Sequence, residues 1–438
     1  MKNICLYFQV HQPFRLRNYS FFDIGNDHYY YDDYLNELVL SKVVEKCYLP
    51  TNELLLKLIN KHKGKFKLSF SLTGIVLDQF ELYAPEVIES FKKLAATGQV
   101  EFLAETYSHS LASQNKWEIF EQQIKKHSQR IEELFGQKPQ VFRNTELIYS
   151  DEIGDRVYKM GYKGMLTEGA KHILGWKSPN FLYFNPLQPK LKLLLKNYKL
   201  SDDIAFRFSD TNWSEYPLTA NKFASWLSDI DKKDEIVNLF MDYETFGEHQ
   251  WQETGIFKFL ESFPDSVFKL TDFNFELPST LLKKHQPIAV ANVPFPISWA
   301  DEERDITAWL GNDMQKEAFD KLYSLAPKVE QITDPEILQD WEYLQTSDHF
   351  YYMSTKWFSD GEVHAYFNPY KNPYNAFINY MNVLSDFINR VNDIVPDIEE
   401  NETINELNSS IRTQKEEIKT LKLKMKKMRQ KMKDTKTN

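Results

Sequence analysis

The sequence predicts an α/β protein, because two kinds of segment alternate through residues 1–295. Short apolar or alternating runs recur, and amphipathic stretches with apolar residues at helical spacing lie between them. Strands and helices that alternate in this way form a parallel sheet with helices outside it. The expected strands are residues 4–10, 66–72, 100–104, 141–144, 164–166, 204–208 and 237–241. This pattern alone does not separate a closed barrel from an open sheet.

The segments after residue 295 are helical in period and are separated by Pro, Gly or Asp residues. They comprise residues 305–329, 334–354 and 375–395. We therefore expect three parts: an α/β unit at 1–295, a helical bundle subdomain at 296–395 that contributes to the active-site cleft, and a tail at 396–438.

The tail is basic, with eleven Lys or Arg residues against three acids in residues 411–438. Its apolar residues from Ile404 to Met432 recur every three or four positions. This spacing predicts a coiled-coil-like helix that would join copies of the chain, and a solvated basic helix is the alternative.

Composition and charge exclude several classes of protein. Hydrophobic residues at 42% and charged residues at 26% are ordinary for a globular protein. The net charge is -10 in spite of the basic tail, which argues against a nucleic-acid partner. Cys5 and Cys47 form neither a disulfide framework nor a metal-binding pattern. The N-terminal apolar run is too short for a signal peptide or a membrane span, so we expect a cytoplasmic protein without a membrane partner.

Several expected strands end in polar residues that suit catalysis. His11 follows the first strand, and Glu105, Glu146, Glu168 and Asp242 follow four others. The C-terminal ends of parallel barrel strands surround the active site, and like charges gathered there are unfavourable unless the site uses them. Two carboxylates across a cleft suit cleavage of a glycosidic bond: one attacks or activates water, and the other protonates the leaving oxygen.

Other chemistries lack their usual motifs. The histidines show no H-x-x-x-H or H-x-D spacing, and no G-x-S-x-G, G-x-x-x-x-G-K or G-x-G-x-x-G pattern occurs. We therefore expect neither a metal nor a cofactor. A metal-dependent deacetylase on a related barrel remains an alternative.

Five motifs in order resemble those of glycoside hydrolase family 57. They are "HQP" at 11–13, "GQVEFLAET" at 98–106, "FRNTELIY" at 142–149, "MDYETFGEH" at 241–249 and "NPYNAFINYM" at 372–381. The stretch "SWADEERDITAWLGNDMQ" at 298–315 is similar to the α-amylase-like branch. The resemblance covers residues 1–395 and implies an incomplete seven-stranded (β/α) barrel followed by a helix bundle.

The resemblance also implies catalytic roles. It makes Glu146 the nucleophile and Asp242 the general acid/base of a retaining α-amylase-type glycosidase that forms a covalent glycosyl-enzyme. Its substrates would be α-1,4-glucans such as starch, glycogen and maltooligosaccharides. Retention predicts a separation of about 5 to 5.5 Å between the two carboxyl groups. A 4-α-glucanotransferase or a branching enzyme uses the same intermediate and stays an alternative, as does a glucan-binding protein without catalysis.

Further side chains are expected to bind substrate. Motif positions and aromatic character nominate His11, Gln12, Glu101, Glu244, Trp251, Trp309, Trp357, Asn372 and Tyr374. His11 would bond a sugar hydroxyl, with a buried structural histidine as the alternative. Glu101 would support the nucleophile from behind. The tryptophans would stack on glucose rings, although such residues more often pack in cores.

Overall fold

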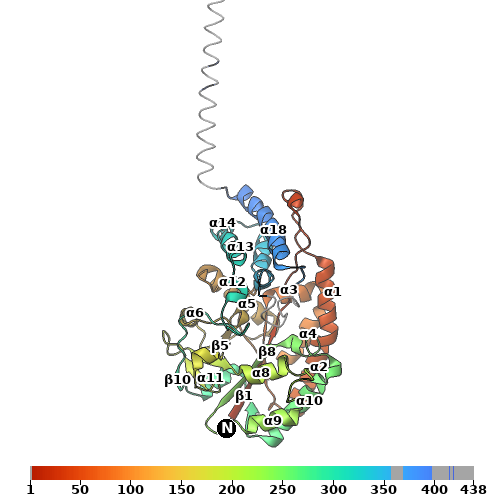
Figure 1. Cartoon of the computed structure of the whole chain (residues 1–438), viewed down its shortest axis with the longest axis vertical. Helices are drawn as coiled ribbons and strands as arrows, with labels where there is room; N and C mark the ends of the chain where they lie inside the picture. The colour runs from red at the N-terminus through yellow and green to blue at the C-terminus, as the bar shows by residue number, and fades with distance from the viewer. Residues whose placement is uncertain (1, 357–367, 397–413, 415–417, 419–438) are drawn as a thin grey trace, which may run out of the picture.

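Strands and helices alternate through most of the described chain, which covers residues 2–356, 368–396, 414 and 418 of this computed structural model (Figure 1). The strands are β1 (Lys2–Val10), β2 (Leu68–Leu72), β3 (Val100–Phe102), β4 (Val141–Arg143), β5 (Gly164–Glu168), β6 (Leu182–Phe184), β7 (Lys192–Lys196), β8 (Ile236–Asp242), β9 (Phe273–Phe275) and β10 (Ala289–Val290). The helices between them are α1 (Asp33–Val43), α2 (Leu49–His62), α3 (Gly74–Tyr83), α4 (Pro85–Ala95), α5 (Trp117–Phe135), α6 (Asp151–Lys159), α7 (Lys171–Leu174), α8 (Tyr198–Ala205), α9 (Ala220–Ser228), α10 (Ile256–Leu270) and α11 (Pro278–Lys284). The predicted α/β class is confirmed.

The strands pair into two sheets of five. One has the order β3-β2-β1-β8 with β9 also on β1, and the other has the order β10-β6-β7-β5-β4. Every pair is parallel except β6 with β7. The sheets approach each other at two places: Ala104 bridges Phe142 in parallel, and the Asn197 amide donates to the Asn238 carbonyl at 2.9 Å. The ends of β3 and β4 are thereby neighbours, and the end of β7 lies beside the first half of β8.

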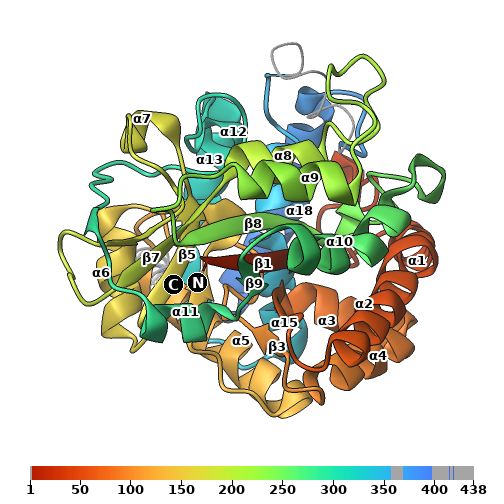
Figure 2. The same ribbon diagram turned by 90° about the horizontal axis from the view of Figure 1, so that it is seen from below.

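Apolar side chains from both sheets pack together between them. This cluster joins Tyr7 of β1 and Phe240 of β8 with Leu166 of β5 and Leu194 of β7. The rings of Tyr7 and Phe240 meet edge to face with centroids 5.6 Å apart. Seen from below, β1 and β8 lie at the centre, and α2, α4, α9 and α10 are among the helices around them (Figure 2). The strand ends are thus held by packing on both faces.

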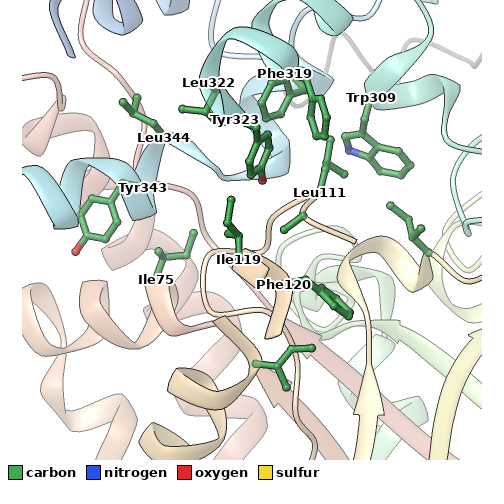
Figure 3. Packing of buried hydrophobic residues seen from close by; sticks show 14 of the residues in the cluster. Ile75, Leu111, Ile119, Phe120, Trp309, Phe319, Leu322, Tyr323, Tyr343 and Leu344 are labelled. Carbon is green, nitrogen blue, oxygen red and sulfur yellow. The ribbon is translucent and has the colours of Figure 1, made fainter. Parts of the chain in front are cut away.

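The C-terminal part is helical, as the sequence predicts. Its helices are α12 (Thr307–Leu310), α13 (Asp313–Tyr323), α14 (Ala326–Val329), α15 (Pro335–Leu344), α16 (Ser347–Tyr351) and α18 (Pro373–Ile394). Figure 3 shows Phe319 and Tyr323 of α13 above Leu111 and above Ile119 of α5, in one buried cluster. These helices therefore pack on the α/β part and share its core.

One predicted strand is wrong. The sequence pattern predicts an extended segment at 204–208, but α8 runs to Ala205 and a turn follows. Ile204 and Phe208 are buried four residues apart, a spacing that serves a helix face as well as a short strand. After β5 the chain instead forms β6 and β7, which pair in antiparallel orientation. The sequence pattern predicts neither strand.

The predicted coiled coil at 396–438 and Trp357 lie outside the described residues, apart from single positions of the tail. In the part of the chain that the structure describes, no helix is both long and apolar enough to cross a membrane.

Candidate active site

Glu146 lies in a strained turn at the C-terminal end of β4. The turn η3 (Thr145–Leu147) follows the strand after one residue, and Glu146 and Leu147 have φ angles of 56° and 53°. Such left-handed conformations cost roughly 1 to 3 kcal/mol in residues other than Gly and cluster at functional sites. The Asn144 side-chain amide closes the turn by donating to the Ile148 carbonyl at 2.9 Å.

Two donors hold the Glu146 carboxylate, one at each oxygen. The Nε2 atom of His109 lies 3.0 Å from Oε1, and the indole Nε1 of Trp299 donates to Oε2 at 2.6 Å. Burial raises the pKa of Glu146, but these hydrogen bonds and the charges of His109 and Arg143 outweigh it and hold the pKa below its usual range. Glu146 is therefore ionised at neutral pH, and its side chain keeps 21% exposure.

His109 connects Glu146 with a second buried carboxylate. Its Nδ1 lies 3.3 Å from Oε2 of Glu105, whose other contacts include the amide of Gln9 at 3.1 Å. Burial lowers the pKa of His109, yet the two carboxylates raise it to about 9, so the ring is positively charged at neutral pH. Burial raises the pKa of Glu105, but the hydrogen bond and charge of His109 and the charge of Arg143 outweigh it and lower this pKa to about 2.

Asp242 terminates β8, the strand beside β1 in the first sheet, and its Cα pairs in register with Gln9. Burial raises its pKa, and the negative charge of Glu146 raises it further, to about 6, against the opposing charges of Arg143, Lys196 and His109. The two acids therefore shift in opposite directions, which is the arrangement that lets one carboxylate stay charged while its neighbour carries a proton.

Arg143 supplies a buried positive charge to the same site. Arg143 is the last residue of β4 and lies three positions before Glu146 in the sequence. Its side chain is 0% exposed, and its Nη1 atom lies 3.9 Å from Oε2 of Glu105. Its guanidinium carbon lies 4.9 Å from the centre of the Trp299 ring. Among the described residues its three nitrogens have no hydrogen-bond acceptor. The charge is therefore balanced electrostatically by the carboxylates around it.

His11 contacts both this cluster and α16 of the helical part. Its Nε2 lies 2.8 Å from Oδ2 of Asp348 on α16, its Nδ1 lies 3.0 Å from Oγ1 of Thr73, and its ring stacks on His109 with centroids 4.0 Å apart. Burial and then the charge of His109 lower the pKa of His11, which favours the neutral ring. Both ring nitrogens are engaged by protein groups.

Gln12 and Glu244 lie close to the acids but are bonded to protein groups. Gln12 accepts from Nη2 of Arg15 at 3.1 Å, and the hydroxyl of Tyr48 donates to Glu244. Burial and then the charge of Asp242 raise the pKa of Glu244 to about 8. Glu244 therefore adds little negative charge beside Asp242 at neutral pH.

Two predicted residues lie elsewhere. The Oε2 atom of Glu101 accepts from the amide of Ser279 at 2.9 Å, so this carboxylate is bonded to the start of α11 instead of supporting the turn at Glu146. Trp309 is 2% exposed and packs against Tyr351 in the core of the helical part, so its ring offers no open face.

Of the remaining predicted residues that the structure describes, two are exposed and the third is partly buried. Trp251 is 63% exposed and Tyr374 is 62% exposed, whereas Asn372 caps α18 by accepting from the amide of Asn375 at 2.9 Å. Among the described residues, no three or more His, Cys, Asp or Glu side chains form a group that could hold a metal ion.

Sequence reasoning did not identify the groups that hold Glu146. His109 follows Glu105 by four residues, and Trp299 lies in the stretch "SWADEERD", yet neither position marks a catalytic role by itself. Arg143 stands within the third motif, three residues before Glu146, and that short spacing was the available signal for it.

The chain is similar to known proteins in sequence and in fold. The model of glycosyl hydrolase family 57 matches residues 5–296. A Methanocaldococcus jannaschii protein named "Putative alpha-amylase" is 44% identical over 383 residues, which cover 84% of this chain and 80% of that protein.

Solved structures of similar fold include two enzymes of different activity. A family 57 branching enzyme from Thermococcus kodakaraensis has a TM-score of 0.65 at 12% identity, covering 92% of this chain and 94% of its own. A 4-alpha-glucanotransferase from Thermococcus litoralis has a TM-score of 0.61 at 15% identity, covering 80% of this chain, and this chain spans only 56% of that enzyme. At these identities the likeness is one of fold alone.

Proposed function

The chain belongs to glycosyl hydrolase family 57 and is a glycosidase, and we propose that it cleaves α-1,4-glucans with retention of anomeric configuration. The observation that carries this proposal is the pair of carboxylates at the ends of β4 and β8: His109 and Trp299 bond the two oxygens of Glu146 and, with the charge of Arg143, keep it ionised, whereas burial and the charge of Glu146 raise the pKa of Asp242 to about 6. In the proposal Glu146 is the nucleophile and Asp242 is the general acid/base.

In the first step, an oxygen of Glu146 attacks the anomeric carbon and forms a glycosyl ester. The bond from that carbon to the glycosidic oxygen breaks, and the departing oxygen takes the proton of Asp242. His109 and Trp299 fix the carboxylate of Glu146 for this attack, since each donates to one of its oxygens.

In the second step, water attacks the anomeric carbon from the side that the leaving group has vacated. Asp242 now takes the proton of that water, the ester bond to Glu146 breaks, and both side chains return to their starting states. A sugar hydroxyl in place of water would give transglycosylation instead.

The substrate-binding part of the proposal assigns different roles to different residues. His11 lies beside the charged cluster and would face the sugar bound at the cleaved bond. Trp251 and Tyr374, both largely exposed, would stack on rings of the glucan further out.

The proposal includes an incomplete seven-stranded barrel made of β1, β2, β3, β4, β5, β7 and β8.

Anomeric products and a trapped intermediate test the mechanism. Proton NMR of maltoheptaose digestion should first show the α-anomer, and mass spectrometry after reaction with an activated fluoro-sugar should find the label on Glu146. Glu146→Gln should lose at least about 1,000-fold in kcat. The control Glu152→Gln changes an exposed carboxylate on α6 and should keep wild-type turnover. A β-anomer as the first product contradicts retention.

Product lengths separate hydrolysis from transfer. Hydrolysis of maltoheptaose raises the number of reducing ends with every bond cleaved, whereas transfer redistributes chain lengths at constant reducing ends. We expect the number of reducing ends to rise. Constant reducing ends with longer or branched products would assign the chain to transglycosylation.

A further inference from the structure

Residues 298–305 form a loop that delivers Trp299 to the end of β4. Trp299 contacts Glu146 twice: its indole Nε1 donates to Oε2 at 2.6 Å, and its backbone amide donates to the Glu146 carbonyl at 3.2 Å. The backbone contact fixes the loop against the turn, and the indole contact fixes the carboxylate. A segment 153 positions away along the chain thus determines how one oxygen of Glu146 points.

The loop is closed around Arg304. The Nη1 atom of Arg304 donates to the Trp299 carbonyl, the Ser298 amide donates to the Arg304 carbonyl at 3.2 Å, and the Ser298 hydroxyl donates to the Asp305 carbonyl at 2.5 Å. Arg304 and Asp301 have φ angles of 53° and 55°. The guanidinium of Arg304 is thereby bonded to the backbone of the residue that holds Glu146.

Arg304 also ties the loop to the second sheet. Its Nη2 donates to Oδ2 of Asp202 at 3.3 Å, and Lys196 of β7 donates to Oδ1 of the same carboxylate at 3.0 Å. The buried Glu168, at the end of β5, has its Oε2 within 3.9 Å of both cations. Asp202 and Glu168 therefore each contact both Arg304 and Lys196. These contacts hold the loop against β7.

Two cations also lie against the indole. The Nζ atom of Lys196 is 5.2 Å from the centre of the Trp299 ring, and the guanidinium carbon of Arg143 is 4.9 Å from it. Cation–π attraction restrains the plane of the ring, so the Nε1–H group keeps its direction toward Glu146.

We propose that Trp299 is a positioning residue for the Glu146 carboxylate and that Arg304 acts through Trp299. This inference rests on the proposed function, because it takes Glu146 to be the nucleophile. With His109 at one oxygen and Trp299 at the other, the carboxylate cannot turn about its last bond. Loss of Trp299 leaves the group free to rotate, which lowers the rate of attack and leaves substrate binding largely unchanged.

Trp299→Phe tests the first part, since it keeps an aromatic ring and deletes the N–H donor. We expect kcat on maltoheptaose to fall roughly 10- to 100-fold, the effect of one hydrogen bond to a charged group, while KM changes less than about threefold. The acidic limb of the kcat/KM profile should move to higher pH, because Glu146 loses one donor while His109 and Arg143 remain. Trp176→Phe, at a site 93% exposed, is the matched control.

A double-mutant cycle tests the second part. Arg304→Met should lower kcat in the same direction as Trp299→Phe, Arg304→Lys should recover part of the loss, and the double variant should lose less than the product of the single losses. Independent, multiplicative losses would overturn the coupling. An unchanged kcat in Trp299→Phe, or a loss confined to KM, would overturn the role of Trp299.

Circular dichroism determines whether Trp299→Phe folds. If it does not fold, the Arg304 variants alone test the inference. Glu146→Gln separates the two claims. Wild-type turnover in Glu146→Gln removes the proposed nucleophile, and with it this inference. An inactive Glu146→Gln beside a fully active Trp299→Phe rejects the inference alone.

Discussion

Replacing His109 with Gln removes the positive charge between Glu105 and Glu146, and we expect the loss of stability to depend on pH. The pKa of His109 is raised from its ordinary value of 6.5 to about 9. A shift of this size corresponds to about 3 kcal/mol in favour of the charged ring in the folded protein. The side chain is 2% exposed, so solvent screens this interaction weakly.

The direction follows from proton linkage. The folded pKa of His109 lies above the unfolded value, so the stabilisation is fully present below pH 6.5 and is lost as the pH rises through about 9. His109→Gln has no such proton to release. The difference in unfolding free energy between wild type and variant should therefore be larger at pH 6.5 than above pH 9, by about 3 kcal/mol.

Urea denaturation followed by tryptophan fluorescence at a series of pH values measures this difference. The matched control is His127→Asn: this histidine is also buried, but burial lowers its pKa, so its ring is neutral through the whole window. Its substitution should cost the same at both ends of the pH range. Equal destabilisation by His109→Gln at pH 6.5 and above pH 9 would refute the charged bridge.

Four other changes have defined outcomes. Asp242→Asn should lower kcat at least about 100-fold and abolish the fall in kcat/KM that accompanies its deprotonation near pH 6 in wild type, as steady-state profiles would show. Glu146→Gln should lower the pKa of Asp242 because a neighbouring negative charge is removed, which carboxylate infrared titration measures. Trp309→Ala should cost roughly 3 to 5 kcal/mol in urea unfolding while folded molecules keep their kcat, because the ring is a buried core group. Gly247→Ala should lower the melting temperature in calorimetry, since φ is 115° and a Cβ would lie 2.0 Å from the Lys46 carbonyl oxygen.

The positions of the acids could be predicted because they depend on local sequence. An apolar strand followed by a polar motif places a side chain at a strand end whatever the rest of the fold does, so the pattern nominates the acids Glu105, Glu146, Glu168 and Asp242. The family resemblance then selects Glu146 and Asp242 among them. The helical segments after residue 295 could be predicted for the same reason. Apolar residues three and four apart determine a helix locally.

Features set by distant contacts could not be predicted. The pattern at the end of α8 indicates a strand as readily as a helix, because Ile204 and Phe208 are compatible with both periods until their burial is known. The motif that contains Glu101 suggests a place near the proposed nucleophile, whereas its carboxylate accepts from the amide of Ser279 of α11. The partnership of Trp299 with Glu146 joins two loops whose proximity only the folded chain creates.

Under the proposed mechanism, the charges of the site would let one aspartate serve as acid and then as base. Before attack, the negative charge of Glu146 raises the pKa of Asp242, which favours the proton that the leaving oxygen needs. In the proposed mechanism, formation of the glycosyl ester would neutralise Glu146, while Arg143, Lys196 and His109 would still lower the pKa of Asp242. The same residue would then become a carboxylate that can accept a proton from water. In this proposal Arg143, Lys196 and His109 act as a fixed set of positive charges near Asp242, and the reaction itself would remove the negative charge of Glu146 that raises the pKa of Asp242.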